Sequence, residues 1–291
     1  MKERLAASEL VLNPDHSIYH LKLHPEQISQ KIIVVGDQAR VATVSERFDS
    51  IEHRVQNREF ITHTGRVGNT RITALSTGIG TDNIDIVLNE LDALVNIDLP
   101  NREIKSESTS LEIIRIGTSG ALHADIPVDS FVASSYGMGF DGLLNYYAGM
   151  KQVDEPNLVN SFMKHAGWLP GMPYPYTVAG SDRLLKQIAH DMTQGITATA
   201  PGFYGPQGRQ LRLAAAKPDL NELLGSYSYN GHRITNFEME TSALYGLGKM
   251  LGHDCMTVCA IIANRAAGQY SKDYKPVIAK LIDTVIERFV V

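Results

Sequence analysis

The sequence Lys31-Ile32-Ile33-Val34-Val35-Gly36-Asp37, at residues 31–37, indicates the class of this fold. Its unbroken apolar run is rich in β-branched residues, which is typical of a strand buried on both faces. Gly36 ends the run, and Asp37 is a suitable N-cap for a helix over residues 38–48. A buried strand followed at once by a helix is the building unit of an α/β protein.

The same alternation continues along the chain. Apolar runs predict strands at residues 111–116, 131–135, 176–179, 196–199 and 256–263, and helical spacing predicts helices over 82–95, 181–191, 219–227, 241–251 and 272–289. Gly68-Asn69 predicts a hairpin between strands at 58–67 and 71–76. These elements predict an α/β fold, a three-layer α/β/α arrangement with a mixed central sheet and helices on both faces.

We expect one domain over residues 1–291, because no linker, repeat or low-complexity segment divides the chain. Residues 1–30 are expected to form an N-terminal arm with a short extended element at 19–23. Residues 97–110 are polar and contain a proline, so we expect a surface loop there. Residues 140–175 are aromatic and interrupted by Gly and Pro, which predicts a long surface excursion.

Composition argues against several classes of function, among them nucleic-acid binding and membrane association. The 291 residues are 43% hydrophobic and 20% charged, with a net charge of −5, which argues against a surface for nucleic acid or anionic membranes. The sequence has no apolar run long enough for a bilayer and no secretory leader, so we expect a cytoplasmic protein. Cys255 and Cys259 are expected to be reduced core thiols, and neither the cysteines nor the histidines have the spacing of a metal site.

Two carboxylates stand one residue apart in Glu238-Met239-Glu240, inside core-like sequence. In an extended segment alternate side chains point to the same side, so Glu238 and Glu240 are expected to do so. Buried carboxylates are costly unless they are paired or hydrogen-bonded. A ligand rich in hydroxyls, such as a ribose, would satisfy them, and so would salt bridges where a strand meets a helix.

Two predicted strands end in small residues with an arginine beside them. Residues 34–40 place Arg40 one turn inside a helix start, which suits an anion, although a plain surface arginine fits the same pattern. Residues 114–120 place Arg115 inside a buried strand, where it needs a bound anion or an internal acid such as Glu240 or Asp125. Residues 76–80 repeat the strand-then-glycine pattern, but the chain lacks G-x-G-x-x-G, so we exclude a nicotinamide cofactor.

The loop at residues 203–209 combines an aromatic ring, an amide and a guanidinium. Phe203, Gln207 and Arg209 together suit a planar polar heterocycle such as a nucleobase, and a flexible exposed loop is the alternative.

Taken in order, these segments resemble the nucleoside phosphorylases, and among them the members that cleave uridine. The resemblance runs from about Tyr19 to the C-terminus and skips residues 97–110, which resemble an insertion. It rests on Gly-Asp-x-x-Arg at 36–40, Arg-Glu-Phe at 58–60, Ser-Thr-Gly-Ile-Gly at 76–80, Arg-Ile-Gly-Thr-Ser-Gly at 115–120, Phe-Tyr-x-x-Gln-x-Arg at 203–209, Glu-Met-Glu at 238–240 and Asn-Arg at 264–265.

The resemblance implies a transferase that converts uridine and phosphate to uracil and ribose 1-phosphate in nucleoside salvage. It implies phosphate binding by Gly36, Arg40, Arg115 and Thr118, with Arg58 donated by a neighbouring subunit. It implies ribose binding by Met239 and Glu240 with the neighbour's His20, and uracil binding by Gln207 and Arg209 between Phe203 and Ile262. A homodimer is then the minimal active unit, and no metal or organic cofactor is expected.

The chain departs from the family pattern at several positions. Val35 and Gln38 stand where prolines are usual in the family. Some relatives bind a monovalent cation between subunits near the position of Asn83, where a serine is usual, so the sequence does not decide whether this chain binds one. Purine-cleaving relatives carry an aspartate after the penultimate strand, whereas this chain has Asn264, which favours a pyrimidine base. The alternatives are a purine nucleoside phosphorylase, a hydrolytic nucleosidase, and a catalytically idle nucleoside-binding protein.

Overall fold

The computed structural model describes residues 4–291 of the chain. The strands are β1 Lys31–Val35, β2 Ser50–Asn57, β3 Phe60–Val67, β4 Thr70–Ser76, β5 Ile97–Asp98, β6 Glu103–Ile104, β7 Glu112–Ala121, β8 Phe131–Gly139, β9 Tyr176–Ala179, β10 Thr193–Thr199, β11 Ser228–Tyr229, β12 His232–Glu238, β13 Asp254–Asn264 and β14 Gln269–Tyr270. The helices are α1 Gln38–Ser45, α2 Thr81–Asn96, α3 Met150–Val153, α4 Pro156–Ala166, α5 Asp182–Ile188, α6 Leu220–Ser226, α7 Thr241–Leu251 and α8 Lys275–Phe289. Short 3-10 turns lie at Pro25–Gln27, Leu143–Tyr146 and Gly205–Gln207.

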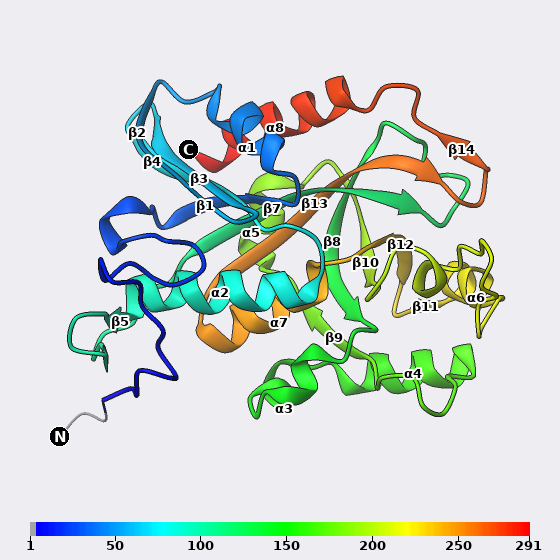
Figure 1. Cartoon of the computed structure of the whole chain (residues 1–291). Coiled ribbons are helices and arrows are strands. Elements are labelled where there is room, and N and C mark those ends of the chain that lie inside the picture. The colour runs from blue at the N-terminus through cyan, green and yellow to red at the C-terminus, as the bar shows by residue number, and fades with distance from the viewer. Residues whose placement is uncertain (1–3) are drawn as a thin grey trace.

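Most strands belong to one mixed sheet in the order β11-β12-β10-β8-β13-β7-β1-β4-β3-β2. β1 runs parallel to both β4 and β7, and β7 runs parallel to β13. β12 also pairs antiparallel with the end of β7, through Asn236 with Ala121 and Phe237 with Gly120. This second pairing closes β7, β13, β8, β10 and β12 into a ring, while β1 to β4 extend from it as an open sheet (Figure 1).

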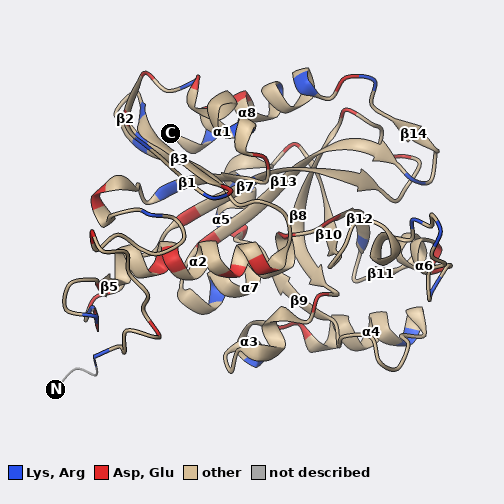
Figure 2. Cartoon of the chain, in the orientation of Figure 1, with Lys and Arg blue, Asp and Glu red and all other residues tan. Residues whose placement is uncertain are grey.

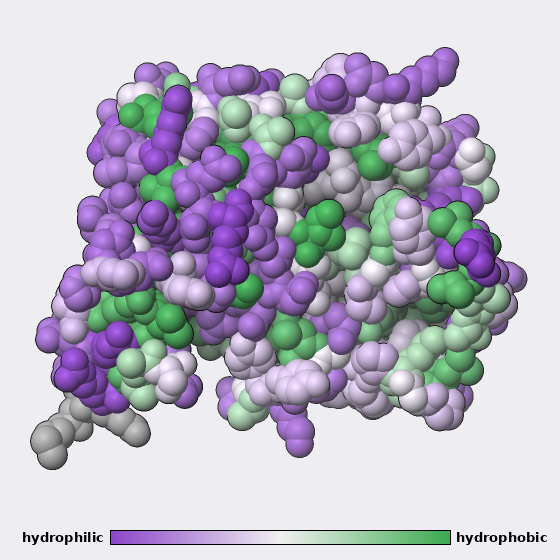
Figure 3. All heavy atoms as spheres, in the orientation of Figure 1, coloured by the Kyte–Doolittle hydropathy of each residue, from purple (hydrophilic) through white to green (hydrophobic). Residues whose placement is uncertain are grey.

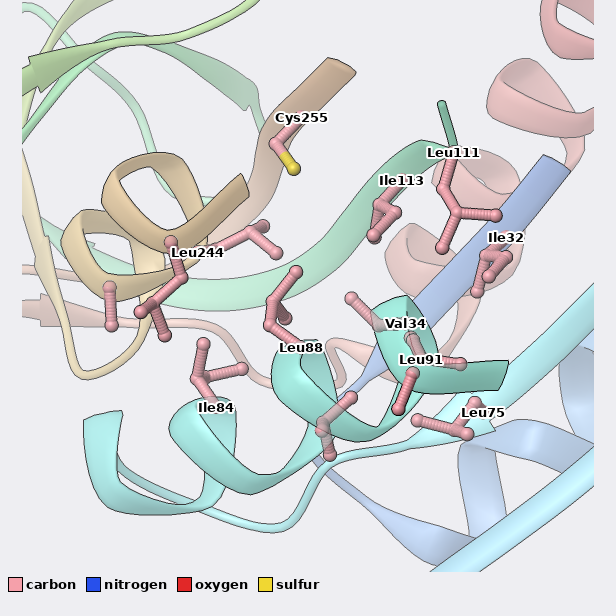
Figure 4. Packing of buried hydrophobic residues seen from close by; sticks show 14 of the residues in the cluster. Ile32, Val34, Leu75, Ile84, Leu88, Leu91, Leu111, Ile113, Leu244 and Cys255 are labelled. Atoms are coloured by element: carbon pink, nitrogen blue, oxygen red, sulfur yellow. The ribbon is translucent and has the colours of Figure 1, made fainter. Parts of the chain in front are cut away.

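Helices cover both faces of the sheet, and β1 shows why its sequence is apolar throughout. Ile32 and Val34 face α2 and α7, whereas Ile33 and Val35 belong to the core beneath α1, α5 and α8. Figure 4 shows Leu88 of α2 directed toward β7 and Ile84 of α2 directed toward Leu244 of α7. The predicted three-layer fold with a mixed central sheet is confirmed.

A third hydrophobic core lies under α4 and α6, beside β8, β10 and β12. Phe140 and Phe162 stack with ring centroids 5.5 Å apart, and Trp168 joins them. The prediction that residues 140–175 form a surface excursion is therefore wrong in part, because α4 buries Leu158 and Phe162. Most of the Gly and Pro residues that broke the pattern lie between the helices, and Pro156 is the first residue of α4.

Two further local predictions are wrong. Residues 19–23 form a turn instead of an extended element, with Lys22 in the left-handed region, and Leu21 and Leu23 are buried in the core. Residues 97–110 contain the β5–β6 hairpin, so they are not a plain loop. Among the helices described over residues 4–291, none combines the length and the apolar character needed to cross a membrane.

Candidate active site

The parallel register brings the ends of β1 and β4 beside the middle of β7. Val35, the last residue of β1, pairs with Ser76 at the end of β4 and with Ile116 of β7. Gly36, Thr77 and Gly117 therefore lie side by side, and the amide of Thr77 donates to the carbonyl of Val35 at 2.8 Å. The carboxyl ends of parallel strands are where open α/β sheets bind ligands.

Arg115 and the two glutamates form a buried cluster at this edge. All three residues are 4% exposed. The Nη1 atom of Arg115 lies 3.1 Å from Oε2 of Glu238, and its Nη2 atom pairs with Glu240. Both carboxylates thus point to the same side of their segment, as predicted. Arg115 pairs with Glu240, one of the internal acids considered as an alternative to a bound anion.

The surrounding backbone fixes each carboxylate. Glu238 accepts from the hydroxyl of Thr199 at 2.7 Å and from the amides of Glu240 and Thr241 at 2.9 Å, so it caps the first turn of α7. Glu240 accepts from the amide of Gly80 at 2.8 Å. Gly80 has φ of +100°, a conformation that favours glycine, which explains the glycine in the 76–80 motif.

The cluster carries an excess of negative charge, because two carboxylates face one guanidinium. Burial raises the pKa of Glu240, although the attraction of Arg115 opposes that shift. Burial lowers the pKa of Arg115, but the two glutamates outweigh burial and hold it above its ordinary value. The Nε atom of Arg115 has no hydrogen-bond partner within residues 4–291, so a donor remains for a ligand oxygen.

Arg40 supplies a second guanidinium beside the cluster. Asp37 accepts from the amide of Ala39 at 2.9 Å and starts α1, which holds Arg40 in the first turn. The Nη1 atom of Arg40 lies 3.4 Å from the carbonyl of Ile116, next to Arg115 in sequence. Burial lowers the pKa of Arg40, and the charge of Arg115 lowers it further. The charges of the two arginines, Arg40 and Arg115, and of the two glutamates therefore sum to zero within one chain.

Arg58 and His20 lie together at the side of this edge. His20 Nδ1 is 2.6 Å from a carboxylate oxygen of Glu90, and its carbonyl accepts from Asn57 at 2.7 Å. Arg58 is in the left-handed region, with φ of +53°, in the turn between β2 and β3. Gln38, one of the departures from the family pattern, donates from Nε2 to the carbonyl of Arg58 at 3.0 Å. Within the chain the His20 ring faces Glu90 of α2, and the guanidinium of Arg58 lies 5.6 Å from the ring of Tyr19 in the N-terminal arm.

The loop at 203–209 is ordered by its own polar groups. Arg209 donates from Nη1 to Oε1 of Gln207 at 2.6 Å and to the carbonyl of Phe203 at 2.7 Å. Its guanidinium lies 3.8 Å from the centroid of the half-exposed Phe203 ring. Gln207 is only 5% exposed, whereas Phe203 and Tyr204 are 50% and 55% exposed, so the loop is exposed apart from this buried amide.

Arg265 connects this loop to the strand edge, and it was not among the predicted site residues. Its Nη1 atom donates to the carbonyl of Gln207 at 3.2 Å, and its amide donates to the carbonyl of Ala121 at 2.9 Å. The loop is thereby tied to the end of β7, the strand that carries Arg115. The Asn-Arg motif contained the signal, because it places a cation directly after a buried strand.

The remaining predicted residues lie on the elements that frame the cluster. Thr118 is half-buried in β7, Met239 is half-buried between the two glutamates, and Ile262 is half-buried in β13. Asn264 is 1% exposed and donates to the carbonyls of His123 at 2.8 Å and Ile126 at 2.7 Å. Its amide is fully engaged in holding backbone, so it offers no proton to a leaving group.

Comparison with known proteins places these residues in a family. The profile of the Phosphorylase superfamily matches residues 30–289. A uridine phosphorylase of Treponema pallidum is 31% identical over 250 residues, 85% of this chain and 82% of that protein. A uridine phosphorylase of Thermococcus kodakarensis is 26% identical over 279 residues, 94% and 86% of the two chains. A Trypanosoma brucei nucleoside phosphorylase, whose crystal structure is described as showing uridine phosphorylase activity, superposes with a TM-score of 0.84 at 28% identity, covering 97% and 99% of the chains.

Proposed function

Because this chain belongs to the phosphorylase superfamily, we propose that it transfers the ribosyl group of uridine to phosphate, releasing uracil and ribose 1-phosphate. The observation that carries the proposal is the buried Arg115, held between Glu238 and Glu240 at a strand edge that Arg40 also reaches. An anion-binding arginine and a hydroxyl-binding carboxylate in contact suit a reaction that joins phosphate to a sugar carbon.

Phosphate binds to Arg40 and Arg115 with the backbone at Gly36 and the hydroxyl of Thr118. Glu240 accepts from the ribose hydroxyls, and Met239 packs beneath the sugar. Phosphate then attacks C1′ as the bond to the base breaks, so the sugar passes through a state with positive charge. Holding both reactants in line supplies much of the acceleration, and Glu240 stabilises the charge that develops on the ribose.

The leaving uracil takes up the electron pair of the broken bond, and its carbonyl oxygens become negative. Gln207 and Arg209 donate to those oxygens, with Phe203 and Ile262 on either side of the ring. Each well-placed donor contributes roughly 3–4 kcal/mol of transition-state stabilisation. The hydrogen bond between Arg209 and Gln207 supports this assignment, because it orients both groups before the base arrives.

The site is proposed to be completed by a second subunit, which would contribute Arg58 and His20. Charge balance supports this arrangement. Arg40, Arg115, Glu238 and Glu240 sum to zero, so a phosphate dianion needs a further cation. The minimal active unit is then a homodimer with shared sites.

The proposed reaction uses phosphate as a co-substrate and draws on no metal or organic cofactor. We further propose a role in nucleoside salvage in the cytoplasm. The two cysteines, Cys255 and Cys259, are free and buried, which suits a reducing compartment.

The test is the preference for uridine over inosine at saturating phosphate. A neutral purine departs poorly unless an acid protonates it, and Asn264 donates both amide protons to backbone. We expect kcat/KM for inosine to be lower than that for uridine by roughly a hundredfold or more. Equal values for the two nucleosides would overturn the pyrimidine assignment.

A further inference from the structure

A cavity of about 780 Å³ lies between the 203–209 loop and the aromatic core beside α4. It shares only Arg209 with the residues proposed to bind uridine and phosphate. Its walls come from the segments 168–173 and 201–220, together with Phe140. A space of this size falls within the range of sites for small organic ligands.

The walls are apolar and rich in aromatic rings. Trp168 lies 5.0 Å from Phe140 between ring centroids, and Tyr204 faces them from the loop. Leu211 and Leu213 line the same cavity, yet they are 79% and 85% exposed. Large apolar side chains that stay this exposed around a hollow commonly mark a binding surface. A flat aromatic ligand would cover them and stack on the rings.

The charged groups of the cavity are all cationic. Among the lining residues of the described chain, Arg209, Arg212 and Lys217 carry charge and none is acidic. Lys217 pairs with Asp219 at 3.3 Å. Arg209 donates to a carbonyl and an amide oxygen but has no carboxylate partner within residues 4–291, and Arg212 has no ion pair there. Two guanidinium charges therefore lack an anion.

This local charge contrasts with the rest of the chain, whose net charge is −5. In Figure 2 basic segments lie in the loop beside α6, at the right of the view. In Figure 3 hydrophobic side chains on the same side of the molecule flank a strongly hydrophilic group. The surface over this loop thus combines apolar and cationic character.

We propose that this cavity is a second ligand site, which binds a small aromatic anion: a fused or linked ring system that carries one carboxylate or sulfonate. The rings lie against Phe140, Trp168 and Tyr204, and the acid group is held by Arg212 and Arg209. Uridine is a poor occupant because it is uncharged and its ribose hydroxyls would find apolar walls.

Occupation of the cavity would act on the reaction through Arg209, which lines both sites. An anion that attracts Arg209 away from Gln207 weakens the donor pair for uracil, so the ligand would raise KM for uridine. This second step rests on the proposed function, whereas binding to the cavity does not.

The experiment compares two probes with the same rings, 1-anilinonaphthalene-8-sulfonate and its uncharged analogue N-phenyl-1-naphthylamine. Trp168 is the only tryptophan of the chain, so excitation at the red edge of tryptophan absorption gives energy transfer from one donor that lines this cavity, and the variants below locate the bound probe. We expect saturable energy transfer from Trp168 to the sulfonate probe without any substrate present, and tighter binding of the sulfonate than of the neutral probe.

Two variants and one control locate the site. Arg212→Gln should weaken the sulfonate probe by up to about fivefold and leave the neutral probe unchanged, as for the loss of one exposed ionic contact. Ala215→Phe should fill the cavity and weaken both probes by about tenfold or more. Lys280→Gln, the same loss of charge on the exposed face of α8, should change neither.

Several outcomes would overturn the proposal. Absence of energy transfer, or tight binding that survives Ala215→Phe, would show that the probe binds elsewhere. Equal affinity for the two probes, with no effect of Arg212→Gln, would refute the preference of the cavity for an anionic ligand. A change of oligomeric state in Ala215→Phe, seen by light scattering, would assign the cavity to a subunit interface instead. Because these measurements omit uridine, they fail or succeed independently of the proposed reaction, and the KM for uridine is measured separately.

Discussion

Replacing Arg115 with methionine would keep much of the side-chain volume and remove the one cation that residues 4–291 place on Glu238 and Glu240. Both carboxylates are 4% exposed, so water cannot replace the lost partner. Removing one partner of a buried ion pair typically costs about 3–5 kcal/mol. We expect a loss of that size in the free energy of unfolding at about pH 8.

The two carboxylates should respond differently to this change. Within the described part of the chain, Glu238 keeps one hydroxyl and two amide donors, whereas Glu240 keeps the amide of Gly80 alone. Glu240 should therefore take up the proton, with its pKa raised further than burial already raises it. A rise of about two pKa units corresponds to roughly 3 kcal/mol, which agrees with the expected loss.

The sign of the pH dependence follows from that direction. A folded-state pKa above the unfolded value means that the folded chain holds more protons, so stability falls as pH rises above the unfolded value of 4.5. The gap between Arg115→Met and the unchanged protein should thus be small at about pH 5 and widen toward about pH 8.

Urea unfolding at fixed protomer concentration measures both effects. Glu240→Gln alone should cost little, because Arg115 retains Glu238 as a partner. Adding Glu240→Gln to Arg115→Met should restore most of the loss, since the orphaned charge is gone. The reasoning is refuted if Arg115→Met stays within about 1 kcal/mol of the unchanged protein at about pH 8, or if the double variant is no more stable than Arg115→Met.

Five other substitutions test the site. Gln207→Ala and Arg209→Ala should each lower kcat/KM for uridine by about 10²–10³ while circular dichroism stays unchanged, and native rates in both would exclude the loop from the active site. Asn264→Asp should cost about 1–3 kcal/mol, measured by urea unfolding, because two backbone carbonyls lose a donor, and it should not confer inosine cleavage; a gain of inosine cleavage would contradict this structural role. Arg58→Ala and Arg115→Ala should each be nearly inactive, but co-refolded mixtures should regain about a quarter of native activity, because about half of randomly paired dimers are mixed and each has one intact site. Mixtures that stay as inactive as their parents would place Arg58 in the site of its own subunit.

The class of fold could be predicted from the sequence, because buried strands bounded by glycine leave a strong local pattern. The residues of β1 alternate between two cores, which is why an unbroken apolar run predicted a strand covered on both faces. The closure of the sheet through Asn236 and Phe237 could not be predicted, since it rests on two residue pairs distant in sequence. The helix α4 was missed because it begins at Pro156, ends before Gly167 and is followed by a segment rich in glycine and proline.

The contact among the two glutamates and Arg115 could be anticipated in part, from alternation along a strand and from the cost of a buried charge. The sequence could not show which partner Arg115 takes, because that depends on the pairing of β12 with β7. Arg265 was overlooked as a site residue because its hydrogen bond to the carbonyl of Gln207 joins two loops that are distant in sequence. The cavity beside Trp168 leaves no local pattern at all, since its walls come from segments between residues 140 and 220.

The most direct test of the central claim is the dependence of uracil release from uridine on phosphate. Purified protein is freed of phosphate and incubated with uridine, and uracil and ribose 1-phosphate are quantified with and without added phosphate. We expect no uracil without phosphate and, with it, one ribose 1-phosphate for each uracil. Uracil formed without phosphate, together with free ribose, would show a hydrolytic nucleosidase, and the absence of cleavage in both samples would show a nucleoside-binding protein without this activity.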